Sequence, residues 1–492
     1  MIKSRYIIPI GAFVLIGCMP QSKYKPQEYE MPEEFRIASV QVKFDPSRYI
    51  GDSMIFKMDS SHLAWQHFFK DQKLVDLIQK GLEENFDVRQ AYKKVEIARM
   101  SFRQSNMEFL PSVSGTIANP NYQYRSEDFY SNPASNWYKE SGTEAPSTMY
   151  AYTMQNITGL NFKWEIDIWG NIRSKRAQEL YSYLATDEGK KAVQTRLVSS
   201  IASGYYNLLM HYAQLEVAES NFALSERTLK LVELQYTSGN TTALAKQQTR
   251  SQMLVAKALI PKLKQQISEQ ENELQFLIGG LPGELDIDKS MFEPVFNAIE
   301  RNYSIPLEMI RYRTDIKQAE YELWGANAAV GIAQTNQYPK LVIDLGFGVN
   351  SMLPRNWFNI PGALFGSVIG NLTQPIFSNK RLKTKYEQAK LQRDIKEIAL
   401  QKEVYGAVME VSNVLTMMHS LDEQIAIATE QVQNSQLTIK QANLLFNSGY
   451  ATYLEVINAQ RVALESELKL NQLKEDRLQL KIKLYRSLGG GW

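Results

Sequence analysis

The sequence predicts a mainly α-helical chain that is internally duplicated and that carries membrane-type β-strands between its helices. Three observations predict this fold class: residues that recur in the same order in both halves, apolar residues at helical spacing over very long segments, and stretches in which every second residue is apolar. The chain has 492 residues, enough for several domains, but the duplication favours one composite body.

The duplication rests on copied residues. Residues 87–91 read Asp-Val-Arg-Gln-Ala, and residues 315–319 read Asp-Ile-Lys-Gln-Ala. Further along, the Ser-Gly pair at 238–239 is repeated at 448–449. Both halves are therefore expected to build the same structure.

Five segments follow from this interpretation. Residues 18–60 follow a predicted signal peptide. They are polar, contain prolines and show no sustained spacing of apolar residues, as expected of an extended tether. In chain order, the segments are a signal peptide at 1–17, a lipid-anchored tether at 18–60, a first repeat at 61–283, a linker at 284–306 and a second repeat at 307–492.

The N-terminus has the features of a secretory signal that ends in a lipobox. Lys3 and Arg5 precede an apolar run over 6–16, and Cys18, the only cysteine of the chain, follows it. The run is too short to cross a bilayer as a transmembrane anchor, so we expect cleavage before Cys18 and acylation of this residue. Met19 stands where an Asp commonly retains a lipoprotein in the inner membrane, which favours the outer membrane.

Composition excludes two function classes. With Cys18 acylated no thiol remains, so neither a disulfide nor a thiolate metal site can form within the chain. Two of the 55 basic residues lie in the signal, and its removal leaves 53 Lys and Arg against 53 Asp and Glu. This balance offers no basic excess for nucleic acid.

Two very long helices are expected, one in each half. Residues 171–236 contain neither proline nor a turn cluster, and their apolar residues recur by threes, fours and sevens, as they do in the second half. About 66 residues at roughly 1.5 Å each would make a rod on the order of 100 Å. After each Ser-Gly a second helix, over 241–278 or 451–487, turns back. A shorter helix is expected over 74–107, before Pro111.

Between the helices the period of apolar residues changes to two, which is typical of strands. In 341–350 every odd position is apolar, while the even positions after Val342 are Asp, Gly, Gly and Asn. The four predicted strands are 112–124, 149–166, 340–351 and 362–376, two in each repeat.

One apolar, aromatic-rich face and one face of small polar residues are typical of an outer-membrane β-barrel wall. A half-buried sheet in a soluble domain is the alternative, but the secretion signal and the lack of an apolar helix to cover the sheet disfavour it. Four strands cannot close a barrel, and an open edge cannot stand in lipid. Three copies would make a twelve-stranded barrel with a water channel, with Asp344 and Asn350 facing the lumen. The helices would continue this homotrimer as a coiled-coil barrel.

Several segments match motifs of a known family. Residues 164–170 read Trp-Glu-Ile-Asp-Ile-Trp-Gly, residues 374–377 read Gln-Pro-Ile-Phe, and residues 488–492 read Leu-Gly-Gly-Gly-Trp. In these residues the chain resembles the TolC-like outer-membrane factors, in particular the OprM-type lipoproteins of RND tripartite efflux pumps. The similarity spans essentially the whole mature chain. The two repeats open with further matches, at Trp65, Phe69, Asp71, Leu74, Leu77, Ile78, Asn85 and Asp87, and at Ile305, Pro306, Arg311, Arg313 and Asp315.

The resemblance implies a trimeric channel with a twelve-stranded barrel, a helical tunnel, an equatorial belt and a periplasmic end that is closed at rest. It implies a passive exit duct in the outer membrane, with no cofactor. Its implied partners are two further copies, a periplasmic membrane-fusion adaptor, an inner-membrane RND transporter and outer-membrane lipid. The turns near 237–245 and 447–455 would be the periplasmic tips.

The resemblance also implies roles for tip residues. The family motif has an acidic residue six positions after the tip glycine; Glu455 fills this position in the second repeat, but Ala245 occupies it in the first. A gate of paired tip carboxylates is therefore not expected. The residues expected to contact the adaptor or to close the gate are Ser238, Gly239, Ser448, Gly449, Tyr450, Tyr453, Leu454 and Glu455.

No catalytic or metal site is expected. Residues 279–283 lack the Lys and hydroxyl residue of a phosphate loop and indicate a helix end. Glu165 and Asp167 could pair as a general acid and base, but at the end of a strand they are expected to line the mouth of the lumen. The four histidines, His62, His67, His211 and His419, form no close ligand cluster, and His211 falls on an apolar helical stripe where a packing role is usual.

Two alternatives to an efflux duct remain. A duct for type I protein secretion would use a similar channel, but the lipid anchor and the C-terminal motif favour efflux. A non-conducting, lipid-anchored coiled-coil scaffold would need no strands, and the alternation of apolar and polar residues argues against it.

Overall fold

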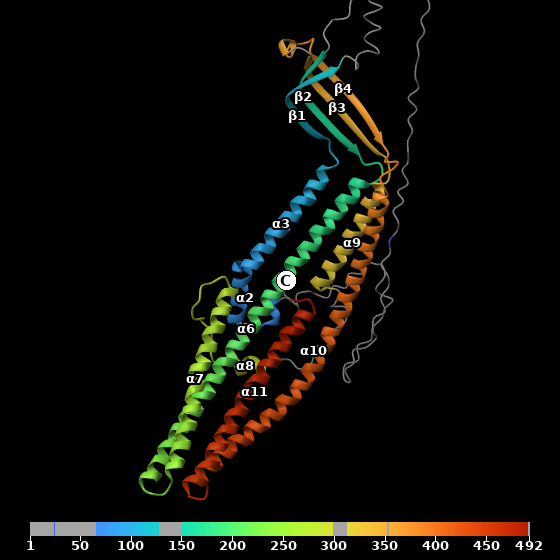
Figure 1. The fold of residues 1–492 in the computed structure, drawn as a ribbon. Helices are drawn as coiled ribbons and strands as arrows, with labels where there is room; N and C mark the ends of the chain where they lie inside the picture. Colours follow the sequence, from blue (N-terminus) through green and yellow to red (C-terminus); the bar gives the residue numbers. More distant parts are fainter. Residues whose placement is uncertain (1–23, 25–64, 127–149, 299–311, 352–353, 491–492) are drawn as a thin grey trace, which may run out of the picture. The chain divides into compact units, whose positions relative to one another are not determined.

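The computed structural model describes residue 24 and residues 65–126, 150–298, 312–351 and 354–490 (Figure 1). The signal peptide, Cys18 and the rest of the tether lie outside the described residues. The chain forms two compact units, and each combines segments from both halves of the sequence. Of the described residues, the first unit contains 24, 99–126, 150–182, 323–351 and 354–395, and the second contains 65–98, 183–298, 312–322 and 396–490.

The first unit holds one antiparallel sheet with the strand order β1–β2–β3–β4, so β1 and β4 are its edges. β4 stops before the expected end at 376, because Thr373 pairs with Lys340, the first residue of β3, and Pro375 beyond it has no N–H to donate to a neighbouring strand. The side chain of Gln374 instead donates to the carbonyl oxygen of Gln337 (3.1 Å). The strands are β1 Ser112–Ser126, β2 Tyr150–Ile166, β3 Lys340–Ser351 and β4 Leu364–Thr373, and the short helix η4 Pro354–Asn356 lies between the last two.

Two helices of 67 residues, α6 Asn171–Thr237 and α10 Arg381–Asn447, confirm the predicted long helical segments. Each is followed by a helix of 35 residues, α7 Ala243–Leu277 or α11 Tyr453–Ser487. Among the described residues, no helix combines the length and the apolar character that crossing a membrane requires. The helices that precede β1 and β3, α3 Phe86–Met107 and α9 Thr314–Thr335, both have 22 residues.

The expected single helix over 74–107 is wrong, because Asn85 separates α2 Gln72–Glu84 from α3. The Oδ1 atom of Asn85 accepts hydrogen bonds from the amides of Asp87 (2.9 Å) and Val88 (3.2 Å). Its Nδ2 atom donates to the carbonyl oxygen of Leu277 (2.9 Å) at the end of α7. Asn85 therefore caps the start of α3 and ties the break to another helix.

The core of the second unit lies where α1 Trp65–Phe68, α2 and α8 Phe292–Asn297, here called the belt, cover one face of α6. Leu74 and Ile78 of α2 and Ile201 of α6 are completely buried in this core. Tyr205 of α6 donates a hydrogen bond to Asp71 (2.6 Å), the N-cap of α2. Burial raises the pKa of Tyr205, and the Asp71 carboxylate raises it further, so the hydroxyl remains a donor at neutral pH.

The four longest helices of the second unit contact one another in the order α7–α6–α11–α10, and α7 also contacts α11. One side-chain pair illustrates each contact. These pairs are Tyr212 with Glu271 for α6 and α7 (2.9 Å), Gln460 with Thr228 for α11 and α6 (2.8 Å), and Arg477 with Asp422 for α11 and α10 (2.8 Å). In this order α7 and α10 are the outer helices.

Candidate functional site

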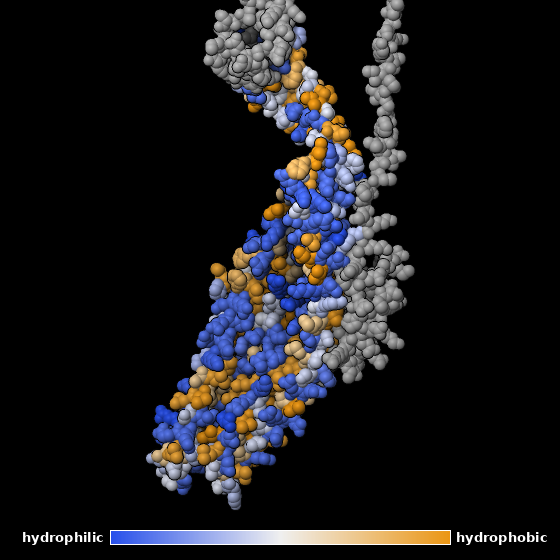
Figure 2. Space-filling model, turned by 45° about the vertical axis from the view of Figure 1, so that its right-hand side comes forward, coloured by the Kyte–Doolittle hydropathy of each residue, from blue (hydrophilic) through white to orange (hydrophobic). Residues whose placement is uncertain are grey.

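The register of the sheet separates apolar from polar side chains. Directly paired residues share a face of the sheet, and Phe162 pairs with Leu345, which pairs with Val368. One position further, Lys163 pairs with Asp344, so this pair lies on the opposite face. Figure 2 shows apolar side chains over the strands. The exposed residues of the apolar face include Val113, Leu160, Trp164, Phe347, Leu364 and Leu372.

Both predicted lumen residues, Asp344 and Asn350, lie on the polar face of β3. Asp344 is beside Ile369 of β4, and Asn371 donates a long hydrogen bond to its carboxylate (3.4 Å). Asn350 lies opposite Ile157 of β2. The polar face therefore also carries apolar residues, which the alternation in β3 alone did not indicate.

The junction between β2 and α6 is held by the two tryptophans of the 164–170 motif. The indole N–H of Trp164 donates to the carbonyl oxygen of Phe109 (2.9 Å), just before β1. That of Trp169 donates to the carbonyl oxygen of Pro339 (2.8 Å), just before β3. The motif thus ties the exit of β2 to the entry of both neighbouring strands.

The expectation that Asp167 lines the mouth of a lumen is wrong, because its side chain is only 8% exposed. Its carboxylate accepts hydrogen bonds from the amides of Ile172 (2.9 Å) and Arg173 (3.1 Å) at the start of α6, and it pairs with the Arg173 guanidinium (3.0 Å). A carboxylate here satisfies free amides and interacts favourably with the helix dipole. Glu165 pairs with Lys340 (3.5 Å). Both acids therefore have local structural partners.

The two tips, one between α6 and α7 and one between α10 and α11, begin with the same turn. Gly239 and Gly449 have φ angles of 76° and 79°, a region that glycine adopts without strain. Each glycine amide donates to the carbonyl oxygen three residues earlier (3.1 Å). The hydroxyls of Ser238 and Ser448 donate to carbonyl oxygens of the last helical turn (3.1 and 2.8 Å). Both Ser-Gly pairs are thus helix C-caps.

The acidic position of the tip motif has a capping role in the second tip. The carboxylate of Glu455 accepts a hydrogen bond from the amide of Thr452 (2.6 Å), which forms a capping box at the start of α11. In the first tip, Ala245 is completely buried, and only the hydroxyl of Thr242 caps its amide (3.2 Å). The carboxylate of Glu455 is therefore engaged at the start of its own helix.

The two tips contact each other through one hydrogen bond and one apolar cluster. Tyr453 of α11 donates to Gln248 of α7 (2.5 Å). Tyr450 and Leu454 do not belong to this cluster, and 85% and 53% of their surfaces are exposed. Among the residues expected to contact the adaptor or to close the gate, Tyr453 is therefore the one whose side chain bridges the tips. The tip cluster consists of Val232, Ala245, Ala442, Phe446, Val456 and Ala459.

We expect Ala245→Glu to loosen the contact between the tips. The new carboxylate would start inside the tip cluster, and burying its charge would cost more than the roughly 1–3 kcal/mol of an unpaired neutral polar group, so the cluster should open to release it. Amide hydrogen exchange of residues 242–248 and 453–459, measured by mass spectrometry on the full chain, should become faster. Ala245→Ser is the matched control, because it adds one small polar atom without charge. Unchanged exchange in the glutamate variant would show that the cluster accommodates a carboxylate.

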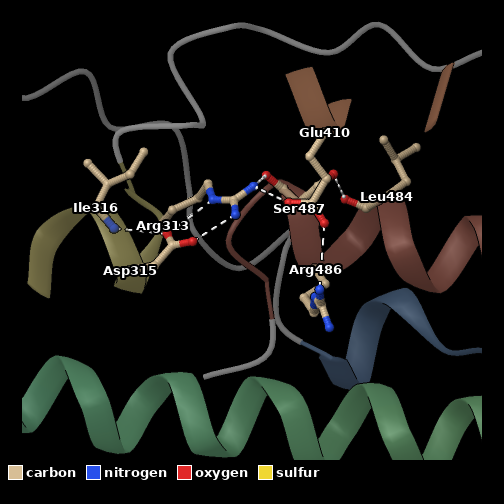
Figure 3. A network of polar contacts seen from close by, with 7 residues as sticks. All are labelled: Arg313, Asp315, Ile316, Glu410, Leu484, Arg486 and Ser487. Carbon is tan, nitrogen blue, oxygen red and sulfur yellow. Dashed lines mark hydrogen bonds and ion pairs between the residues drawn. The ribbon is translucent and has the colours of Figure 1, made fainter. Parts of the chain in front are cut away.

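A polar network joins the start of α9 to the C-terminal residues (Figure 3). Arg313, 12% exposed, donates to Asp315 (2.7 and 3.1 Å), to Glu410 (2.9 Å) and to the carbonyl oxygen of Ser487 (2.9 Å). Glu410 also meets Arg486 (3.6 Å). Burial alone would raise the pKa of Asp315, but the hydrogen bond and charge of Arg313 outweigh burial and lower this pKa. The network links α9, α10 and α11.

The histidines take ordinary positions where they are described. His211 is half-buried in α6, and burial lowers its pKa, which suits a neutral packing residue. His419 is exposed on α10 beside Glu423 (3.5 Å), and His62 lies outside the described residues. Within the part of the chain that the structure describes, no three His, Cys, Asp or Glu side chains are grouped to hold a metal ion.

Comparisons with known proteins add to this geometry. A family model described as outer membrane efflux protein matches residues 77–280 and 307–490. The chain is 26% identical to the cation efflux system protein CusC of Escherichia coli (strain K12), over 98% of each chain. It is 28% identical to the toluene efflux pump outer membrane protein TtgI of Pseudomonas putida, over 87% of each chain. A solved structure of CusC, 25% identical, has a TM-score of 0.79 and covers 96% of this chain and 100% of its own.

These findings confirm four expectations: the family, a mainly helical fold with a four-stranded sheet, a place in the outer membrane and a role as an efflux channel. The named relatives are components of efflux systems and not enzymes. The family match extends over most of the sequence. The chain therefore belongs to the outer membrane efflux protein family.

Proposed function

We propose that three copies of this chain form a passive exit duct, with one shared twelve-stranded barrel in the outer membrane and a helical tunnel in the periplasm. The observation that carries the proposal is the sheet, which has an exposed apolar face and two unpaired edges, β1 and β4. Unpaired edges cannot stand in lipid, so β1 of one copy would pair with β4 of the next. Three copies give a barrel wide enough for a water-filled lumen.

The outer helices of the second unit support the same ring. α10 and α7 both expose apolar side chains that no described helix covers. A contact between α10 of one copy and α7 of the next would bury both sets, and repetition of one such contact closes a ring. The exposed residues are Ile398, Tyr405 and Met409 on α10, and Leu254 and Val255 on α7.

In this proposal the tips are both the gate and the contact site for a periplasmic membrane-fusion adaptor, which links the duct to an inner-membrane RND transporter. The bond between Tyr453 and Gln248 and the tip cluster favour the closed arrangement. The exposed apolar side chains of Tyr450 and Leu454 beside the Ser-Gly turns offer a surface of the kind that partners bind. Lipid on Cys18 would anchor each copy to the outer membrane, and Asp344 and Asn350 would face the lumen.

Opening the tips tests the duct. Tyr453→Phe combined with Gln248→Ala removes the bridging hydrogen bond and leaves the tip cluster in place. We expect the conductance in a planar lipid bilayer to rise at least about threefold, since a hydrogen bond of this kind contributes roughly 0.5–1.5 kcal/mol per copy to the closed state. Tyr92→Phe combined with Gln194→Ala, which removes a Tyr–Gln hydrogen bond between α3 and α6 (3.5 Å) away from the tips, is the control and should leave conductance unchanged. A tip-opened chain that never conducts contradicts the duct.

A lipid-anchored scaffold without a pore is the competing function, and solubility distinguishes the two. The apolar face of the sheet needs lipid or detergent in a duct but not in a scaffold. Chain prepared with serine in place of Cys18 should therefore remain insoluble without detergent. A soluble monomer would support the scaffold.

A further inference from the structure

α6 carries a polar face on the side away from the belt. Leu197, Ile201 and Tyr205 pack toward the belt and are almost or completely buried. Polar residues recur at steps of three and four, so they lie along one side of α6. This side is about a third of a turn around the helix from the residues that face the belt. The polar residues are Arg196, Ser200, Ser203 and Asn207.

The polar face of α6 lines a hollow of about 510 Å³ that α7 and α11 complete. Ser203 is held against α11, since its hydroxyl donates to the side chain of Gln479, which in turn donates to the Ser203 carbonyl oxygen (3.1 Å). The hollow thus has a wall of hydroxyl, amide and charged groups. α7 contributes Gln270 and Glu273, and α11 contributes Gln479, Ile482, Lys483 and Arg486.

Cations outnumber acids in the hollow. Arg196, Lys483 and Arg486 line it together with one carboxylate, that of Glu273. Arg486 forms an ion pair with Glu410 (3.6 Å), which is also a member of the Arg313 network. Arg196 and Lys483 are exposed, and no ion pair joins either of them to an acid within the described residues. Two unneutralised cations therefore face the hollow.

Two buried groups strengthen the preference for a negative ligand. Ser199 lines the hollow and is 8% exposed, yet its hydroxyl has no hydrogen-bond partner among the described residues. A buried donor without an acceptor is costly, and a bound oxyanion would supply the acceptor. Glu475, which accepts a hydrogen bond from Gln479, does not line the hollow, and burial raises its pKa, which disfavours its charged form.

We propose that the hollow is a binding station for oxyanions, such as the phosphate or carboxylate group of an anionic cargo, on the wall of the duct. The proposal rests on the proposed function and adds to it that the face of α6 away from the belt lines the lumen. Guanidinium, ammonium and hydroxyl donors are the groups that hold such oxygens. Three copies would place three hollows at one level of the tunnel. Their combined potential would enrich anions there and disfavour free cations.

Binding of inorganic pyrophosphate to the full chain in detergent, measured by calorimetry, tests the station directly. Arg196→Gln combined with Lys483→Gln should weaken binding by roughly tenfold or more, and Ser199→Ala by about threefold. Both cations are exposed, so their neutralisation should not disturb folding. Lys80→Gln combined with Lys94→Gln removes the same two charges from exposed positions on α2 and α3 and should leave the affinity unchanged.

Ion selectivity separates failure of the station from failure of the duct. In a planar bilayer under a KCl gradient, the tip-opened chain should be more selective for chloride than the same chain with the two glutamine substitutions. A conducting channel whose pyrophosphate affinity and selectivity are unaffected by these substitutions overturns the station and leaves the duct standing. If the tip-opened chain does not conduct, the duct fails, and a station on its wall fails with it.

Discussion

Arg313→Ala should release the C-terminal residues from α9, with amide hydrogen exchange of residues 484–490 roughly 30- to 100-fold faster at neutral pH. The substitution leaves the carboxylates of Asp315 and Glu410 without their shared cation and the carbonyl oxygen of Ser487 without its donor. Removing one partner of a fully buried pair costs about 3–5 kcal/mol. The Asp315 side chain is 41% exposed, so solvent screening reduces the expected cost to about 2–3 kcal/mol.

Two further substitutions define the cause of this effect. Arg313→Lys keeps the charge but cannot make the paired contact with Asp315 while also bonding Glu410 and Ser487, so we expect an intermediate exchange rate. Arg461→Ala removes an arginine from an exposed pair with Glu465 on the same helix, α11, and should cost less than about 0.5 kcal/mol. If the Arg313 and Arg461 variants exchange equally fast, the network does not anchor the C-terminus.

The contribution of the network should also depend on pH. Arg313 holds the pKa of Asp315 below its unfolded value of about 4, so the stabilisation is complete above that value and is lost as the pH falls through the folded pKa. The difference in hydrogen exchange between wild type and Arg313→Ala should therefore shrink in acid. Exchange measured at pH 7 and at pH 3, each corrected for the intrinsic rate, checks this. A difference that stays constant would show that the carboxylate of Asp315 contributes little.

The long helices were predictable because a repeated apolar stripe without proline leaves few alternatives over 67 residues. The break at Asn85 could not be predicted, because the local sequence is compatible both with a continuous helix and with a cap. An asparagine is tolerated inside a helix, and it becomes a cap here because the carbonyl oxygen of Leu277, 192 positions away, accepts from its side chain. Local propensity contains no information about such a partner.

The tips show a second limit of reasoning from repeats. The copied sequences align Ala245 with Glu455, yet Ala245 is completely buried and Glu455 is exposed. The two tips pack against each other with different faces, and a duplication at the level of sequence does not reveal which face each copy uses. The hollow beside α6 could not be predicted for a related reason. Arg196 and Lys483 line the same hollow only because α6 lies against α11, and the sequence does not reveal this contact.

Gly348→Val should prevent β2 from pairing with β3 and so abolish the folded sheet. A Cβ atom on Gly348 would lie 2.2 Å from the carbonyl oxygen of Thr158 and 2.6 Å from the Cα atom of Gly159. Both are backbone atoms, so no side-chain rotation can relieve the clash. Gly348 and Gly159 are directly paired, and the two strands approach closely because neither residue has a side chain.

Gly370→Val is the matched control for this substitution. Gly370 lies in β4 of the same sheet, and a Cβ atom there would meet nothing within 4 Å. Valine is favoured in strands, so this variant should fold at least as well as wild type. The yield of folded oligomer, separated from unfolded chain on an unheated detergent gel after expression into the outer membrane, should be normal for Gly370→Val and near zero for Gly348→Val. Equal yields would mean that the backbones of β2 and β3 can separate at this pair. The close backbone contact between Gly159 and Gly348 would then not determine the register between β2 and β3.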